Sequence, residues 1–359
     1  MIVSMRSRSF IVDNLETEIA VGERIAGDCA RLMNSQPKLI FVPSGLPKRM
    51  KDYIAESFSS SDLIEVEDGE GMKSMDGLAG ILSSLASHRV DRNDTIGYAG
   101  GGTIGDTVGF AASIFKRGID FVALPTTFLA QIDSAIGGKN GINFQAYKNM
   151  IGTFHLPSKI ISDVFFLSGM SEIMLRSGLG ELIKYFILEP EKFAPFLSSG
   201  NVMQTVRSNL ETLVFLCSEV KMEYVSRDFR DRLGIRMMLN MGHTVAHALE
   251  SSSGFSMSHG DSVYWGMLIE AKLVQMMGTD SSDVILNLKR FLTVFKQSRD
   301  ALQSNIDSLA KYMDNDKKVA GGQVRIPFPL PGKRANVIRM DVGWIGKMLD
   351  SNFLDDLLD

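Results

Sequence analysis

Two different patterns of apolar residues meet near residue 165 of this chain, and they limit the folds that it can adopt. Before that point, short β-rich runs alternate with longer segments such as 74–87 and 104–115, whose apolar residues have helical spacing. The strand-like runs, each ending near Gly or Pro, are 38–42, 63–66, 95–99 and 121–124. This alternation predicts an α/β domain with a largely parallel sheet that binds its ligand at the carboxyl ends of the strands.

After about residue 170 the strand-like runs give way to long helical ones. These helical stretches are 172–188, 202–226, 240–251 and 260–277, and 324–326 offers a short strand. At roughly 100–200 residues per domain, a chain of 359 residues is long enough for two domains. We therefore predict domains at 1–165 and 166–359, and we expect a ligand in the cleft that separates them.

Composition excludes several classes of protein. With 38 basic and 42 acidic side chains the net charge is −4, which argues against broad electrostatic capture of nucleic acid or of a membrane surface. The apolar stretch 121–132 is interrupted by Pro125 and Gln131, so we expect no membrane-spanning helix.

Cys29 and Cys217 lack a C-x-x-C spacing, which predicts that both are buried thiols. The amino-terminal residues show no signal-peptide pattern, and we expect a cytoplasmic protein.

A run of glycines follows the third strand-like segment. Gly100, Gly101 and Gly102 stand between the run 95–99 and a helical segment, where backbone amides and a helix N-terminus favour a phosphate. The spacing is not G-x-G-x-x-G, so a tight turn that simply requires glycine is an equal alternative.

Histidines are concentrated in one region. Three of the five, His243, His247 and His259, fall within 17 residues, and the first two share a helix face at i, i+4. Catalytic zinc commonly takes three protein ligands, often two histidines and a carboxylate. Glu181 is a candidate carboxylate, although an ordinary helical ion pair with Lys184 is equally consistent with its spacing. The sequence thus predicts a metal site and leaves its ligand set open.

The segment 117–152 contains polar residues among glycines and has little periodicity in its second half. We expect a long functional loop there, because a polar loop of this length inside a compact domain is either functional or disordered. Lys139 and Lys148 suit a phosphate or carboxylate as point-charge donors, and solvated surface lysines are the alternative.

Six ordered blocks resemble one family. GGGTIGD, RGIDFVALPTTFLAQIDSAIGGKNGIN, KNMIGTFHLP, GLGELIKY, LNMGHTVAHALE and HGDSVYWGM are similar to 3-dehydroquinate synthases of the shikimate pathway, and the resemblance runs from about Val66 to Arg325. It implies a Rossmann-like N-terminal domain that binds NAD, a helical C-terminal domain for metal and substrate, and an active site in the cleft separating them.

The resemblance also implies residue roles. Glu181, His243 and His259 become the ligands of a zinc ion, for which cobalt would also suit, and His247 becomes a substrate contact. The implied NAD contacts are Asp68, Gly69, Glu70, Lys73, Gly102, Thr103, Ile104, Gly105, Asp106, Thr126, Thr127, Lys139, Lys148, Phe166, Leu167, Ser168 and Gly169. The implied catalytic pocket is Asp133, Lys139, Asn149, Lys184, Lys221, Arg236, Asn240, His247 and either Lys317 or Lys318. Arg117 matches an arginine that serves the neighbouring subunit, which implies a homodimer.

The implied reaction converts 3-deoxy-D-arabino-heptulosonate 7-phosphate to 3-dehydroquinate and phosphate, with transient oxidation by NAD. Two alternatives remain open: another sugar phosphate cyclase, of the inosose or valiolone type, and a metal-dependent polyol-phosphate dehydrogenase. Two segments depart from the family pattern, Leu167–Ser171 beside the implied NAD contacts and Asp228–Gly234 after Lys221.

Overall fold

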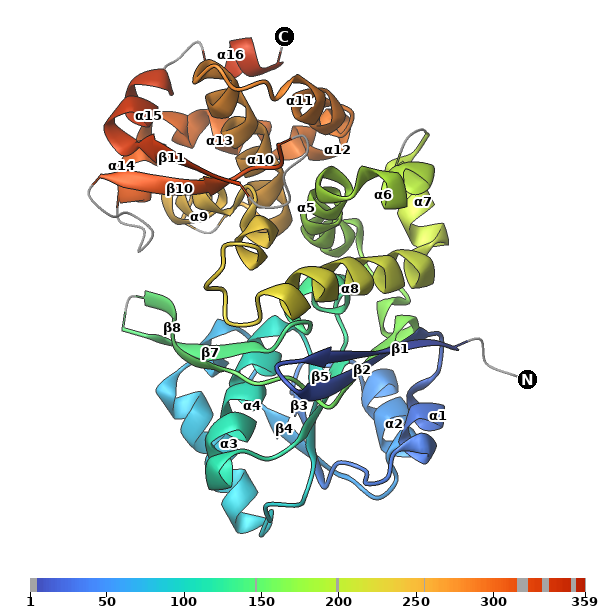
Figure 1. The fold of residues 1–359 in the computed structure, drawn as a ribbon. Coiled ribbons are helices and arrows are strands. Elements are labelled where there is room, and N and C mark those ends of the chain that lie inside the picture. Colours follow the sequence, from blue (N-terminus) through green and yellow to red (C-terminus); the bar gives the residue numbers. More distant parts are fainter. Residues whose placement is uncertain are drawn as a thin grey trace. The chain divides into compact units, whose positions relative to one another are not determined.

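The computed structural model describes residues 5–145, 147–197, 200–254, 256–314, 322–330, 336–349 and 353–358. Their contacts form two compact units (Figure 1). Unit 1 comprises Met1–Met170 and Asn209–Arg230, and unit 2 comprises Ser171–Ser208 and Asp231–Asp359. The later segment joins unit 1 because its helix packs on elements of that unit, whereas the domain limits 1–165 and 166–359 remain a prediction.

Unit 1 is built on a twisted sheet in the order β1-β2-β9-β6-β5-β3-β4. The strands are β1 (Met5–Val12), β2 (Leu15–Gly22), β3 (Leu39–Pro43), β4 (Asp62–Val66), β5 (Ile96–Gly100), β6 (Phe121–Pro125) and β9 (Lys159–Asp163). β1 pairs with β2 antiparallel, and the other pairs are parallel. All residues of β3, β5, β6 and β9 are buried, as expected for strands covered on both faces. The predicted parallel α/β fold is confirmed.

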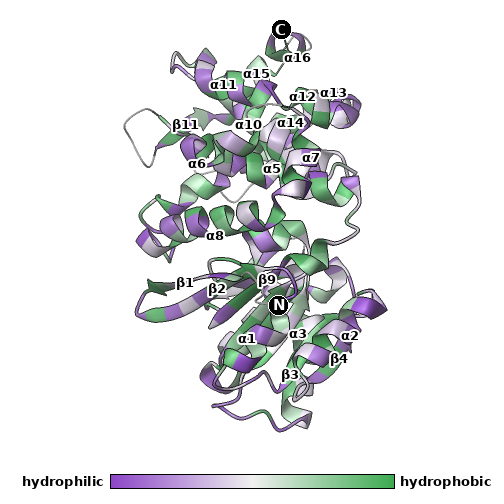
Figure 2. Ribbon diagram, turned by 90° about the vertical axis from the view of Figure 1, so that its right-hand side faces the viewer, coloured by the Kyte–Doolittle hydropathy of each residue, from purple (hydrophilic) through white to green (hydrophobic). Residues whose placement is uncertain are grey.

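Helices cover both faces of this sheet (Figure 1). They are α1 (Ala26–Leu32), α2 (Lys48–Ser57), η1 (Glu70–Met72), α3 (Met75–Ser87), α4 (Gly102–Ile114), η2 (Phe115–Arg117), η3 (Ala130–Ser134), η4 (Val164–Leu167) and α8 (Leu210–Arg227). Beneath α1 and α2 lies a core that includes Val42, Ile54, Phe58 and Ile161. In Figure 2, hydrophobic residues gather on the central strands, while α8 carries hydrophilic and hydrophobic residues in turn along its length.

The second half of the segment expected to be an irregular loop forms a hairpin instead. β7 (Lys139–Phe144) pairs antiparallel with β8 (Tyr147–Phe154), and the hairpin packs beside α4. Gly141 and Gly152 stand opposite each other, and a Cβ on either would overlap the backbone of the other strand. Because these glycines provide no side chains to alternate, the strand period is hidden in the sequence. The loop prediction was wrong over residues 139–144 and 147–152, which are strand.

Unit 2 is mainly helical, which confirms the predicted all-α character of the C-terminal half. Its helices are α5 (Glu172–Leu188), α6 (Pro190–Leu197), α7 (Val202–Ser208), η5 (Arg236–Asn240), α9 (His243–Ser252), α10 (His259–Met276), α11 (Ser282–Lys289), α12 (Leu292–Phe295), η6 (Lys296–Ser298), α13 (Arg299–Asn305), η7 (Ile306–Ser308), α14 (Leu309–Asp314), α15 (Val342–Met348) and α16 (Phe353–Leu358). A hairpin of β10 (Gln323–Pro327) and β11 (Val337–Asp341) completes it.

One detail of the predicted helices differs from the prediction. The stretch 202–226 is two helices, because the chain leaves helical geometry at Asn209. α10 is buried along most of its length, packs against α5 and α9, and forms the centre of the unit. Within the described residues, no helix combines the length and apolarity that crossing a bilayer requires.

Candidate functional site

The strand order places a reversal of direction beside the glycine run. From β3 the chain moves outward to β4, whereas from β5 it moves the other way, to β6 and then β9. The carboxyl ends of β3 and β5 therefore lie at a topological switch point, where open α/β sheets bind their ligands. Gly100 ends β5 there, and a Cβ on it would overlap Ile104 and contact Pro43. Close packing therefore requires glycine at this turn. This agrees with the interpretation of the glycine run as a tight turn, which was the alternative to phosphate binding.

The start of α4 is suited to an anion. No side chain caps the helix at Gly101, and its first turn contains no acidic residue, so the first amides point outward uncapped. Gly102, Thr103, Ile104 and Gly105 lie in this turn. The predicted phosphate-binding role is therefore consistent with the geometry as well.

The segment 68–73 folds against α4 and β7. Glu70 accepts hydrogen bonds from the Thr103 hydroxyl at 3.4 Å and from Asn143 Nδ2 at 2.7 Å. Lys73 forms an ion pair with Asp106, at the start of the second turn of α4. Burial raises the pKa of the Asp106 carboxyl above its usual range, although the Lys73 ammonium opposes the shift. Asp68 and Gly69 precede this contact, and Gly69 has a φ of 90° that favours glycine.

The other candidate residues of unit 1 lie after β6 and on the hairpin. Thr126 follows β6 and donates its amide to the Gly100 carbonyl at 2.9 Å, and Thr127 accepts from the Ala130 amide at 3.1 Å. Lys139 and Lys148 are exposed on β7 and β8. Asn149, also exposed, donates its amide to Asn143 Oδ1 at 3.0 Å, so Asn143 links the hairpin to Glu70.

Lys221 and Asp133 form a contact that brings α8 onto η3. Lys221 Nζ lies 2.9 Å from Asp133 Oδ1 and donates to the Asp133 carbonyl at 2.8 Å. Both residues belong to unit 1, although 88 positions separate them. The fold therefore brings together two residues that only the family resemblance had grouped.

The segment that departs from the family pattern is held by an arginine that the sequence did not indicate. Arg49 Nη2 on α2 donates to the Ser168 carbonyl at 2.7 Å. Phe166 and Leu167 are buried, and Gly169 has a φ of 79°. Ser168 and Gly169 are exposed, whereas the side chains at 166 and 167 are enclosed by the protein.

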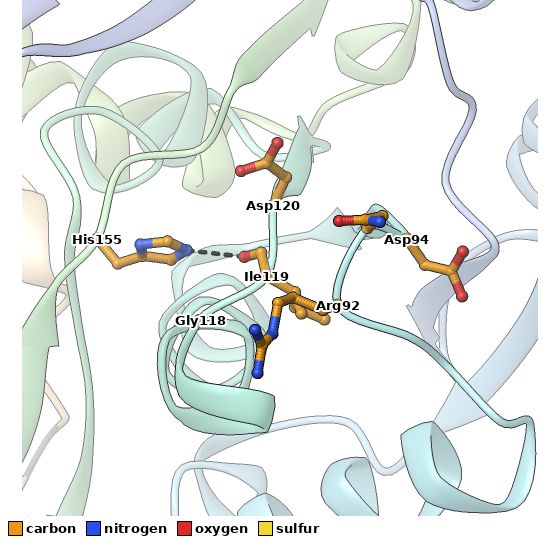
Figure 3. A pocket seen from close by; sticks show the side chains of 7 residues that line it. Arg92, Asp94, Gly118, Ile119, Asp120 and His155 are labelled. Carbon is orange, nitrogen blue, oxygen red and sulfur yellow. Dashed lines mark hydrogen bonds between the residues drawn. The ribbon is translucent and has the colours of Figure 1, made fainter.

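Arg117 lies away from the switch point. It is exposed in η2, just before the amino end of β6, whereas the glycine turn follows the carboxyl end of the neighbouring strand β5. A hollow opens at the same amino-terminal edge (Figure 3). It is lined by Arg92, Asn93, Asp94, Gly118, Ile119, Asp120 and His155, and His155 Nε2 donates to the Ile119 carbonyl at 2.9 Å. None of its lining residues was predicted to act.

In unit 2, three residues distant in sequence converge on one point. His243 Nε2 and His259 Nε2 lie 3.1 Å and 3.0 Å from the same oxygen, Glu181 Oε1. One ligand atom from each of the three residues lies within 4.8 Å of the others. The exposed His247 stands beside His243, with ring centroids 5.7 Å apart, but is not part of this converging group.

Glycines allow the helices that carry these residues to approach closely. A Cβ on Gly180 would overlap the backbone of Gly260, and a Cβ on Gly260 would overlap the carbonyl oxygens of Arg176 and Ser177. Gly180 precedes Glu181 on α5, and Gly260 follows His259 on α10. The close contact between these helices therefore sets the distance between the carboxylate and one imidazole.

Electrostatics keep the carboxylate ionised. Burial favours the neutral form of Glu181, but the Lys184 ammonium and the His243 ring hold the pKa of this carboxyl well below its usual range. Burial lowers the pKa of His243. Burial acts in the same direction on His259, but hydrogen bonds to Glu181 and Glu250 raise its pKa to about 10.

The remaining candidates of unit 2 have varied positions. Lys184 is buried and paired with Glu181. Arg236 is buried and Asn240 half-buried in η5, directly before α9. Lys317 and Lys318 lie outside the described residues.

A divalent metal fits the three converging residues. A carboxylate and two imidazoles are a common ligand set for catalytic zinc and leave a coordination position for substrate. Both Nδ1 atoms are already hydrogen-bonded, His243 to the Met241 carbonyl at 3.1 Å and His259 to Glu250 at 2.8 Å. The Nε2 atoms are thus the ones directed at the shared point. The sequence analysis did not predict a role for Glu250, although it lies seven residues after His243 on α9.

Comparison with known proteins agrees with this arrangement. Residues 63–177 match the family model described as 3-dehydroquinate synthase N-terminal, and residues 178–319 match the one described as 3-dehydroquinate synthase C-terminal. This chain belongs to the 3-dehydroquinate synthase family. A 3-dehydroquinate synthase of Picrophilus torridus is 41% identical over 310 residues, which are 86% of this chain and 88% of that protein. The predicted resemblance is confirmed.

Solved structures share the fold of this 3-dehydroquinate synthase family member. A 2-deoxy-scyllo-inosose synthase complexed with carbaglucose-6-phosphate, NAD+ and Co2+ matches with a TM-score of 0.85 at 23% identity, covering 96% of this chain and 99% of that one. A 2-epi-5-epi-valiolone synthase from Streptomyces hygroscopicus subsp. jinggangensis 5008, with NAD+ and Zn2+ bound, matches at 0.75 and 21% identity, covering 98% and 99%.

Proposed function

We propose that the protein is a 3-dehydroquinate synthase, which converts 3-deoxy-D-arabino-heptulosonate 7-phosphate to 3-dehydroquinate and inorganic phosphate. The observation that carries the proposal is the convergence of Glu181, His243 and His259 in a chain of this family. The cofactors are NAD and a divalent metal, zinc or cobalt, as bound in the inosose and valiolone synthase structures.

Unit 1 binds NAD in this proposal. The uncapped amides at the start of α4 receive the pyrophosphate, and the Lys73–Asp106 pair sets the charge beside it. The segment 68–73, Thr126, Thr127 and the backbone at Ser168 and Gly169 enclose the rest of the cofactor. NAD supplies the transient removal of hydride from a substrate carbinol and its later return.

Unit 2 holds the metal through Glu181, His243 and His259. When bound, the metal supplies Lewis-acid polarisation of the hydroxyl that is oxidised. Lys184, already paired with Glu181, keeps that carboxylate ionised and oriented. His247 and Asn240 lie next to these ligands in the sequence and provide groups that can accept and pass on the hydroxyl proton.

The substrate carries a phosphate and a carboxylate, so several cations are needed at fixed positions. Lys139, Lys148, Lys221 and Arg236 provide them, with Lys317 or Lys318. Asp133 orients Lys221 through the contact described above. Asn149, held on the hairpin by Asn143, adds a neutral hydrogen-bonding group.

The test is release of inorganic phosphate from the heptulosonate phosphate by the purified protein with NAD and zinc. We expect release with catalytic amounts of NAD and no net formation of NADH. An uncarboxylated sugar phosphate, glucose 6-phosphate, is assayed in parallel. Release from glucose 6-phosphate alone would assign the inosose type, whereas stoichiometric NADH formation without phosphate release would assign a polyol-phosphate dehydrogenase.

Two further parts of the proposal concern the assembly and the location. We infer a homodimer in which Arg117 enters the neighbouring subunit's site, because its position at the amino-terminal edge of the sheet separates it from its own chain's switch point. We also keep a cytoplasmic location, with sugar phosphates and no nucleic acid or membrane as partners.

A further inference from the structure

Glu250 and His259 make a contact that the proposed reaction does not by itself explain. Glu250 lies in the last turn of α9 and His259 is the first residue of α10, and Glu250 Oε1 is 2.8 Å from His259 Nδ1. The Glu250 side chain is only 11% exposed. The opposite ring nitrogen, Nε2, is the one that faces Glu181.

This contact keeps a proton on His259 Nδ1. A carboxylate can only accept hydrogen bonds, so Nδ1 must be the donor, and the Nε2 lone pair is the one left for a metal once Nε2 has lost the proton that it shares with Glu181. The hydrogen bond also limits rotation of the ring. His243 obtains the same tautomer from the Met241 carbonyl, but that acceptor is neutral. Of the two imidazoles, His259 alone is therefore seen to have a full negative charge behind it.

We propose that Glu250 is a positioning residue of the metal centre, which orients His259 and strengthens it as a ligand for a divalent metal. The inference rests on the proposed metal site. A carboxylate behind a histidine ligand raises the basicity of the ligand, and its removal typically costs about 10–100-fold in metal affinity. Glu250 touches neither substrate nor metal in this role and acts through His259.

The test compares zinc dissociation constants of the full-length protein, measured by competition with a chromophoric chelator. We expect Glu250→Ala to weaken zinc binding by about 10–100-fold. Glu250→Gln keeps the shape but its amide can donate as well as accept, so the tautomer is no longer fixed and an intermediate loss is expected. The visible spectrum of the cobalt-loaded Glu250→Gln protein should shift, because the ligand field at His259 changes.

Ser281→Ala is the matched control. Ser281 is buried in the same unit and its hydroxyl donates to the Ala271 carbonyl at 2.7 Å, far along α10 from His259. Its replacement should lower stability without changing zinc affinity. Equal zinc dissociation constants for the wild-type, Glu250→Ala and Glu250→Gln proteins would overturn the role of Glu250 alone. Failure of the wild-type protein to bind zinc would contradict the proposed metal site as well.

Discussion

His259 Nε2 lies 3.0 Å from Glu181 Oε1 while its Nδ1 lies 2.8 Å from Glu250 Oε1, so the ring is held by two carboxylates. Its pKa is raised to about 10, and the metal-free ring therefore carries a second proton at neutral pH. A metal must displace that proton from Nε2. We expect zinc binding at pH 8 to release about one proton, measured by titration calorimetry in two buffers of different ionisation enthalpy.

The displacement of the His259 proton by a metal also determines how zinc affinity depends on pH. The pKa of His259 in the folded protein is above its ordinary value of 6.5. Protonation of His259 therefore stabilises the metal-free unit below pH 6.5, and this contribution is lost as the pH rises through 10. Apparent zinc affinity should rise about tenfold per pH unit up to pH 10. An affinity independent of pH between 7 and 9 would contradict this arrangement.

Gly260 determines how closely α5 and α10 approach. A Cβ there would overlap two backbone carbonyl oxygens of α5, which cannot move as a flexible side chain can. We expect Gly260→Ala to cost about 1–3 kcal/mol of unfolding free energy and to weaken zinc binding, because Glu181 and His259 are moved apart. Urea denaturation and chelator competition measure the two effects.

Gly80→Ala provides the matched control for that substitution. Gly80 is also in a helix, α3, but a Cβ there would meet nothing within 4 Å. The change should stabilise the protein by about 0.5–1 kcal/mol and leave zinc affinity unchanged. If both alanine variants behave alike, the close helix contact does not position the ligands.

The Lys73–Asp106 pair predicts an effect on NAD. Without the Lys73 ammonium, the half-buried Asp106 carboxyl loses its partner, and a pyrophosphate at the start of α4 loses a nearby cation. We expect Lys73→Met to weaken NAD binding by at least about tenfold, equivalent to 1.4 kcal/mol, in a fluorescence or calorimetric titration. Lys116→Met is the control, because its partner Asp91 is exposed and the pair contributes little. Unchanged NAD affinity in Lys73→Met would place the pyrophosphate elsewhere.

Both thiols should be inert in the folded protein. Cys29 and Cys217 are buried, and burial raises the pKa of the Cys29 thiol to about 11. Since the thiolate is the reactive form, we expect almost no reaction with a disulfide reagent at pH 8 and two reactive thiols per chain in denaturant. Rapid labelling of the native protein would show that one of the thiols is accessible.

Local sequence patterns predicted the parts of the fold that are locally determined. The four strands β3–β6 were expected within one residue at each end, because they are short runs rich in β-forming residues that stop at Gly, Pro or a turn. β1 was missed because it is an edge strand whose outward residues are Arg and Ser. The β7–β8 hairpin was missed because the facing glycines Gly141 and Gly152 interrupt the alternation of side chains. The break at Asn209 was missed because the residues on both sides of it, in α7 and α8, have helical patterns.

The site was less accessible to local reasoning, since its contacts join distant residues. Histidine spacing indicated a metal but favoured His247, which shares a helix face with His243. Glu181 is 78 residues from His259, so only the family resemblance or the packing of α5 on α10 connects them. Arg49, Asn143 and Glu250 support the predicted residues through hydrogen bonds. Asn143 and Glu250 lie in the quoted blocks, but nothing in their spacing indicated a role, and Arg49 lies outside every block.

The proposed role of Arg117 predicts complementation between two inactive variants. If Arg117 serves the neighbouring subunit, Arg117→Ala and His259→Ala are each inactive as homodimers. In a hybrid dimer, the site with an intact metal centre receives Arg117 from the other subunit. Random assembly of equal amounts should therefore restore about one quarter of wild-type phosphate release, because half of the dimers are hybrids with one working site each. A co-expressed mixture that stays inactive, although the hybrid is isolated with two different affinity tags, would show that Arg117 acts within its own chain.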